Sequence, residues 1–313
     1  MRLSFETINS SKANFDDIYC MDDPRGYFSV LGALDYMIPD IAAPIVRQVL
    51  AARARQYDIG RAPLILDVGC SYGINAAVHR FPVTFAVLRR RYTRREVARL
   101  SSAELLEFDR NYYASWPDIG LGNFIGLDPS VPAIAYAKNV GLIEAGITTD
   151  LERFDPTPAD RRLLEGTDVV LSTGAVGYVT DKTYRRILGA VRRTPWIVSF
   201  VLRMFPYDSL ASVFAENGLV TERLASAVFV QRRFRDVAEF DSTLQALRER
   251  GVQTDGFESD GLLRAELFLS RPATDAWAAP IDDIVTVCSG LNRPVGTRYV
   301  KLAEDEAEVA LEQ

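Results

Sequence analysis

Cysteine and histidine are scarce in this 313-residue chain, which contains 3 cysteines and 1 histidine. Cys20, Cys70 and Cys288 lie far apart and form no C-x-x-C pair, so the sequence supports neither a disulfide framework nor a zinc site. We therefore expect no bound metal. His79 is the single histidine and ends a predicted helix, where a structural role is more frequent than that of a general base. No catalytic triad or metal cluster competes as the reactive centre.

Excess positive charge and long apolar runs are also missing. The formal net charge is -6 at pH 7, so a phosphate backbone or an anionic membrane would on average be repelled. The arginines between positions 89 and 99 lie beside glutamates, which is typical of a solvated helix face. No apolar stretch resembles a membrane span or a signal peptide. These absences predict a cytoplasmic protein with a small-molecule partner and with neither nucleic acid nor membrane; the oligomeric state stays open.

The pattern that is present alternates short apolar runs with helical spacing, which predicts βαβ units and a mostly parallel, doubly wound α/β sheet. We expect helices between the strands at 74–78, 131–142, 184–191 and 210–216. The predicted strands are residues 64–68, 124–128, a short one near 147, 168–173 and 196–202, followed by β-like runs over 220–234 and 262–270.

Segments outside this repeat divide the chain into parts. Residues 1–60 form a predicted N-terminal helical lid, residues 61–272 the α/β domain, and residues 273–313 a C-terminal extension whose acidic end, 304–312, should be on the surface or frayed. An insertion at 79–122 lies between the first helix and the second strand. Ser101 and Glu104 form a capping box there, which begins a helix followed by Tyr112, Tyr113 and Trp116. This aromatic end is a candidate cap over a substrate, although packing against the main sheet is the more frequent arrangement.

The first predicted strand ends in the sequence Leu66-Asp67-Val68-Gly69-Cys70-Ser71-Tyr72-Gly73 and leads into a helix. Small residues at positions 69, 71 and 73 allow a ligand to lie against the main chain, beside the helix N-terminus. The spacing does not fit the G-x-G-x-x-G fingerprint, because Ser71 stands where a glycine is needed. A dinucleotide site is therefore disfavoured.

This signature closely resembles motif I of the class I S-adenosylmethionine-dependent methyltransferases, and further motifs follow in the same order over residues 60 to 234. The resemblance implies a seven-stranded Rossmann-like sheet with an antiparallel last strand, and S-adenosylmethionine (SAM) as the cofactor. It also implies that an acidic residue after the second strand binds the ribose hydroxyls. The cofactor-binding residues that it implies are Asp67, Gly69, Cys70, Ser71, Gly73, Asp128, Pro129, Asp150, Leu151, Ser172, Thr173 and Gly174.

Tyrosines are the predicted neighbours of the reacting end of the cofactor, because a sulfonium cation is stabilised by aromatic faces. Tyr178 follows the fourth strand and the glycines Gly174 and Gly177, and it is the predicted catalytic residue. Tyr72 and Tyr136 are further candidates from the core domain, although a residue on a helix, such as Tyr136, is more often core. Tyr19, Arg25 and Tyr27 are candidates from the lid, for which helix packing is an equally good explanation.

The sequence thus predicts a methyltransferase for a small molecule, with secondary metabolism as a candidate setting. Residues 69–77, 174–178 and 200–207 are also similar to the azetidine-2-carboxylate synthases. That similarity implies an alternative in which SAM is cyclised, with methylthioadenosine as the leaving product. A catalytically silent, methyltransferase-like binding subunit is the remaining alternative.

Overall fold

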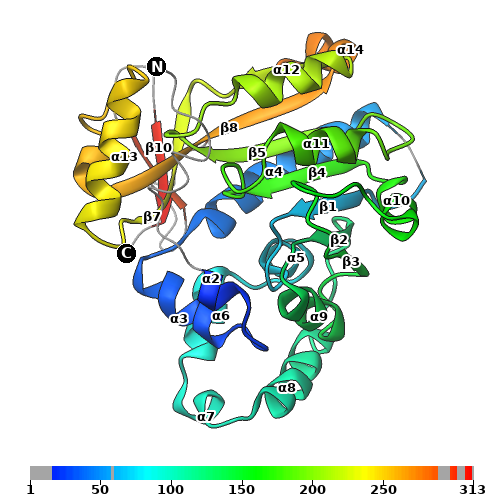
Figure 1. Cartoon of the computed structure of the whole chain (residues 1–313), viewed down its shortest axis with the longest axis vertical. Helices are drawn as coiled ribbons and strands as arrows, with labels where there is room; N and C mark the ends of the chain where they lie inside the picture. Colours follow the sequence, from blue (N-terminus) through cyan, green and yellow to red (C-terminus); the bar gives the residue numbers. More distant parts are fainter. Residues whose placement is uncertain (1–15, 58–59, 288–296, 302–306, 312–313) are drawn as a thin grey trace.

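A computed structural model describes residues 16–57, 60–287, 297–301 and 307–311 (Figure 1). Strands β1 to β5 of the described chain are parallel and have the order β3-β2-β1-β4-β5; β8 then pairs antiparallel with β5 and leads on to β7, β10 and β9. The predicted α/β class and the antiparallel last strand of the repeat are confirmed. The strands are β1 Leu64–Val68, β2 Asn123–Leu127, β3 Ala145–Ile147, β4 Val169–Thr173, β5 Trp196–Leu202, β6 Leu219–Arg223, β7 Ala227–Arg233, β8 Leu262–Pro272, β9 Thr297–Lys301 and β10 Ala307–Leu311.

Helices cover both faces of the sheet, because successive side chains of a strand point to opposite sides. In β1, Ile65 packs in one core with α4, α5 and α9, whereas Leu66 and Val68 pack in a second core with α11, α12 and α13. The helices are α2 Asp16–Tyr19, α3 Arg25–Ala33, α4 Ile38–Gln56, α5 Ile74–Arg80, α6 Phe85–Tyr92, α7 Arg95–Ala98, α8 Ser102–Ala114, α9 Val131–Asn139, α10 Pro158–Leu164, α11 Asp181–Leu188, α12 Asp208–Glu216, α13 Val237–Glu249, α14 Ala273–Ala278 and α15 Ile281–Ile284.

The N-terminal helices and the insertion pack against each other. In Figure 1, α2, α3 and α6 to α8 gather on the side of the molecule away from α11 and α12. The rings of Phe28 and Tyr92 stack with centroids 4.6 Å apart. Arg25 donates to the carbonyl of Leu100 at 2.8 Å. The capping box of Ser101 and Glu104 forms as predicted and begins α8.

The structure corrects the sequence prediction after β5. The run at 220–234 is not one strand: β6 and β7 pair antiparallel with different halves of the long strand β8. Helix α13, which Asp236 caps, was not predicted, and in Figure 1 it lies beside β7 at one end of the sheet. Residues 307–311 form an unpredicted strand, β10, alongside β7; residues 304–306 and 312 lie outside the described chain.

The described residues contain two free cysteines, of which Cys20 is exposed and Cys70 is buried, while Cys288 lies outside them. No group of His, Cys, Asp and Glu side chains within the described ranges could hold a metal ion. No single described helix is long and apolar enough to cross a membrane; α3 and α4 pass that test only as a pair, across a 97° bend.

Candidate functional site

A cavity of about 480 Å³ lies at the carboxyl ends of β1, β2 and β4. This edge is where open α/β sheets bind their ligands. The cavity walls come from the turn after β1, the ends of β2 and β4, the turn after β3, the N-terminal helices and β7. The lining residues are Tyr19, Cys20, Tyr27, Leu31, Tyr36, Gly69, Ser71, Leu127, Asp128, Pro129, Ser130, Thr149, Asp150, Leu151, Glu152, Thr173, Gly174, Ala175, Tyr178, Val179, Thr183, Gln231 and Arg232.

The turn after β1 adopts a left-handed backbone at Gly69, Ser71 and Gly73, with φ of 72°, 47° and 80°. A Cβ on Gly69 would lie 2.6 Å from the Cβ of Ala175, so only glycine allows this turn to meet the loop after β4. Ser71 is an unusual residue for this conformation, and its buried Oγ has no hydrogen-bond partner among the described residues. The strained turn therefore presents an unsatisfied polar atom at the cavity wall.

Asp128 follows β2 and joins it to this turn. Its Oδ2 accepts a hydrogen bond from the Ser71 N–H and its Oδ1 accepts one from the Ser130 N–H, both at 2.9 Å. Burial raises the pKa of Asp128, while these two hydrogen bonds oppose the rise. Each carboxylate oxygen can accept more than one hydrogen bond, so Asp128 still has acceptor capacity toward the cavity.

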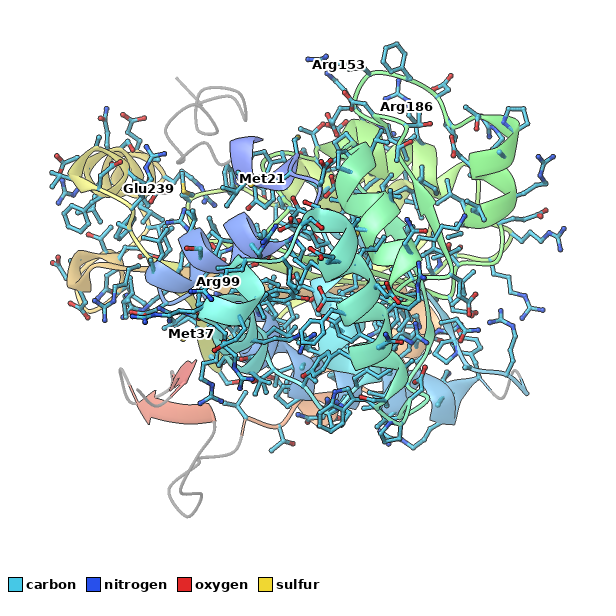
Figure 2. All side chains as sticks on the ribbon, turned by 90° about the horizontal axis from the view of Figure 1, so that it is seen from below. Met21, Met37, Arg99, Arg153, Arg186 and Glu239 are labelled. Atoms are coloured by element: carbon cyan, nitrogen blue, oxygen red, sulfur yellow. The ribbon has the colours of Figure 1, made fainter. Side chains whose placement is uncertain are left out.

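The turn after β3 supplies another wall through Thr149, Asp150 and Leu151. Asp150 Oδ1 accepts from the Glu152 N–H at 3.0 Å, and the Leu151 carbonyl accepts from Arg186 at 2.8 Å. Figure 2 labels Arg186 and Arg153 together at this end of the molecule. The turn is thereby fixed to α11.

Asp67 lies beneath the cavity rather than in its wall and is fully buried. Its Oδ1 accepts from Asn75 at 2.8 Å, and Asn75 in turn lies 3.0 Å from the Thr173 hydroxyl. Burial raises the pKa of Asp67 to about 7. This network connects the end of β1 to the end of β4.

Four tyrosines, Tyr19, Tyr27, Tyr36 and Tyr178, line the end of the cavity under the N-terminal helices. The ring centroids of Tyr19 and Tyr27 are 5.7 Å apart, and those of Tyr27 and Tyr36 are 6.4 Å apart. Burial raises the pKa values of Tyr19, Tyr27 and Tyr36, so these phenols stay neutral at physiological pH. Tyr178 is the most open of the four, at 39% exposed.

Residues of β7, which the sequence analysis missed, form the remaining wall. Gln231 and Arg232 line the cavity, and Arg232 is paired with Glu239 of α13 through distances of 2.6 and 2.8 Å. The Met37 N–H donates to the Gln231 carbonyl, so the same strand holds the segment that carries Tyr36. The signal in the sequence that could have identified them was the occurrence of two polar residues, Gln231 and Arg232, after the apolar run of this strand.

The cavity brings together most of the predicted site residues. Tyr19, Tyr27, Gly69, Ser71, Asp128, Pro129, Asp150, Leu151, Thr173, Gly174 and Tyr178 line it, with Asp67 directly beneath. Three predicted residues are supports behind the wall. Ser172 is buried in β4, Cys70 packs against Gly126, and a Cβ on Gly73 would lie 3.1 Å from Ala137 of α9.

Three other predicted residues do not face the cavity. Tyr72 is buried and its hydroxyl donates to the carbonyls of Ile18 and Met21, which ties the N-terminal segment to the β1 turn. Tyr136 donates to Asp109 at 2.6 Å within the core. Arg25 pairs with Asp23 and donates to the carbonyl of Leu100 in the insertion. In each case a partner from another element of the fold was available.

The predicted cap helix, α8, and His79 also pack against other parts of the fold and do not line the cavity. The Arg91 guanidinium lies 3.9 Å from the ring centroid of Tyr112, so the aromatic end of α8 packs within the insertion and not over the cavity. His79 is buried and stacks on Phe124, and burial lowers its pKa to about 3.

A doubly wound sheet with a glycine turn after β1 and a carboxylate after β2 defines a class of α/β proteins that bind nucleoside-type ligands at this edge. No family model matches the chain, and no curated protein matches it. Similar solved structures are SAM-dependent methyltransferases, the group that the sequence resembles.

Among these structures is the plantazolicin methyltransferase BpumL in complex with SAH, with 14% identity, coverage of 86% of this chain and 97% of that chain, and a TM-score of 0.41. Magnesium protoporphyrin IX methyltransferase from Synechocystis with bound SAM has 11% identity, coverage of 86% and 98%, and a TM-score of 0.38. A TehB-like methyltransferase from Corynebacterium glutamicum has 16% identity, coverage of 70% and 86%, and a TM-score of 0.34. These values concern the fold alone.

Proposed function

We propose that this protein is a SAM-dependent methyltransferase that acts on a small molecule. The observation that carries the proposal is the lining of the cavity, which combines a carboxylate with remaining acceptor capacity and a group of neutral tyrosines. Asp128 would accept hydrogen bonds from the ribose hydroxyls. Asp150 and Leu151 would lie against the adenine, and Gly69 would allow the methionine part to lie close to the main chain.

The tyrosines of the cavity suit the sulfonium group of SAM. This cation has no N–H or O–H group to donate to an acceptor, and aromatic faces stabilise its positive charge. Methyl transfer proceeds largely by alignment of the acceptor with the methyl group, which fits a site without a metal ligand set or an accessible histidine within the described residues. Tyr178, on the loop after β4, is the residue we propose to act at the reacting atoms.

The test is incubation of the pure protein with SAM, first alone and then with pools of candidate small molecules. Release of S-adenosylhomocysteine (SAH) only when an acceptor is present is the expected result. Methylthioadenosine without an acceptor would instead identify the cyclising enzyme. Binding of SAM in calorimetry with neither product in any pool would favour the silent binding subunit, and absence of binding would reject the cofactor itself.

A further inference from the structure

A bulge in β7 determines which of its side chains reach the cavity. Consecutive residues of a regular strand point to opposite faces, yet Gln231 and Arg232 both line the cavity. The pairing with β8 explains this, because its register shifts between Val230 and Arg232. Bulges of this kind re-aim a side chain and are frequent beside active sites.

The side chain of Gln231 has an unsatisfied polar atom. It is 4% exposed, and its Oε1 is buried without a hydrogen-bond partner among the described residues. Its Nε2 lies over Gly174, where a Cβ would come within 2.3 Å of it. A buried acceptor that lacks a partner destabilises the protein, so a donor from a cavity occupant would relieve an existing cost.

The position of Gln231 limits what that donor can be. Gly174 and Ala175 belong to the loop that meets Gly69, so Gln231 lies over the junction of the β1 turn and the β4 loop, away from the β2 end that holds Asp128. Arg232 does not make the region strongly cationic, because Glu239 lies within 2.6 Å of it. A cationic donor can therefore approach Oε1.

Resting on the proposed function, we infer that Gln231 binds the α-ammonium group of SAM through Oε1. Beyond the ribose, SAM has a sulfonium, a carboxylate and an ammonium, and only the ammonium donates hydrogen bonds. With Asp128 at the ribose, the amino acid part extends toward the junction beneath Gln231. This residue then distinguishes cofactors with an amino acid part from simple nucleosides.

The experiment compares the binding of SAH, which retains the ammonium, with that of 5′-methylthioadenosine, which lacks the whole amino acid part. Calorimetry on Gln231→Leu should show SAH binding weakened by roughly tenfold to a hundredfold, the range for a hydrogen bond to a charged group. Affinity for 5′-methylthioadenosine should stay at the wild-type value. Gln231→Glu retains an acceptor oxygen and should recover most of the SAH affinity.

Controls separate this role from a general effect on folding. Gln245→Leu makes the same chemical change on an exposed position of α13 and should leave both affinities unchanged. If Gln231→Leu lowers the melting temperature, Gln231→Met fills the same space with a flexible side chain and serves instead.

The remaining outcomes overturn the inference in distinct ways. Unchanged SAH binding in Gln231→Leu, or equal weakening for both ligands, means that Gln231 does not contact the ammonium. Weakening in Gln231→Glu as large as in Gln231→Leu means that the amide N–H₂ makes the contact. If the wild-type protein binds neither ligand, the proposed function itself fails, which the wild-type measurement alone reveals.

Discussion

Asp128 is the residue on which the cofactor proposal most depends. Asp128→Ala should weaken SAM binding by at least about tenfold, because hydrogen bonds from the ribose to a charged group are worth roughly 1.5–3 kcal/mol each. Calorimetry measures the affinity, and Asp241→Ala, an exposed aspartate of α13, is the matched control. Since Asp128 also holds the Ser71 and Ser130 N–H groups, thermal melting must accompany the titration. Unchanged affinity would remove Asp128 from the site.

Substitutions at Tyr178 distinguish two roles that a tyrosine can have at the reacting atoms. Tyr178→Phe keeps a ring that could face the sulfonium, a contact worth roughly 0.5–2 kcal/mol, and deletes the hydroxyl; Tyr178→Ala deletes both. If the ring matters, Phe should retain most turnover and Ala should lose it. If the hydroxyl orients the acceptor, both variants should lose kcat, with a smaller change in SAM affinity. Parent-like turnover in both would make Tyr178 a packing residue.

The sequence predicted residues of the cavity wall well where their geometry is local. Gly69, Ser71 and Asp128 follow predicted strands directly, so the parallel sheet alone brings them to one edge. Tyr72 and Tyr136 do not line the cavity, because the direction of a side chain depends on partners distant in sequence, here the Ile18 carbonyl and Asp109. Gln231 was missed because a bulge depends on the partner strand, which a single segment does not reveal.

At the scale of elements, α2 and α3 are the part of the structure that ligand binding should stabilise. They carry Tyr19, Tyr27 and Leu31 into the cavity wall, and lids belong to the less stable elements of a fold. Hydrogen exchange should slow in α2, α3 and the following loop when SAM is added. Helix α12 packs on the other face and serves as the internal reference. No change in α2 and α3 would argue against a lid.

The insertion should behave differently from the N-terminal helices. Helix α8 packs through Tyr112 against Arg91 and does not line the cavity, so its exchange rates should change little with SAM. In Figure 2, Arg99 of the insertion appears close to the N-terminal helices, where Arg25 contacts the carbonyl of Leu100. A strong SAM-dependent slowing in α8 would mean that the two parts move as one body.

The order of the helices and strands along the chain was predicted more completely than the pairing of the strands. Glycine turns and strand composition predicted β1 to β5 and the helices α5, α9, α11 and α12, whereas α10, between β3 and β4, was not predicted. The division of 220–234 into β6 and β7 was not predicted either, because it results from the length of β8, which is long enough to pair with two strands. Strand β10 was likewise missed, since it lies within the acidic stretch 304–312 and its pairing with β7 cannot be recognised from that segment alone.

For the whole molecule, two buried groups give the stability opposite dependences on pH. The pKa of Asp67 is raised to about 7, so the folded state binds more protons than the unfolded state and loses stability as pH rises from about 4 to 7. The pKa of His79 is lowered to about 3, so the folded state loses stability as pH falls below about 6.5. Between about pH 4 and pH 6.5 the contributions of Asp67 and His79 to stability change in opposite directions and partly cancel.

Single substitutions should uncover each contribution. Relative to the wild type without ligand, Asp67→Asn should gain stability as pH rises from 4 to 7, by up to about 4 kcal/mol at about 1.4 kcal/mol per pKa unit, and then level off. His79→Leu should show the opposite sign, with a relative gain as pH falls below about 6.5. Urea unfolding at several pH values measures both differences, and a pH-independent difference for Asp67→Asn would contradict the raised pKa.

The pairing of the loop between α3 and α4 with β7 also has a consequence for biosynthesis. The Met37 N–H donates to the Gln231 carbonyl and the Arg233 N–H donates to the Leu34 carbonyl, so a segment made early on the ribosome is completed by one made late. Domains generally fold as units during synthesis, and contacts that are distant in sequence form slowly. The part of α4 that packs against β7 therefore stays uncovered until β7 emerges, although α5 and α6 contact the same helix earlier. A nascent chain stopped before β7 should need chaperones that the finished protein no longer needs.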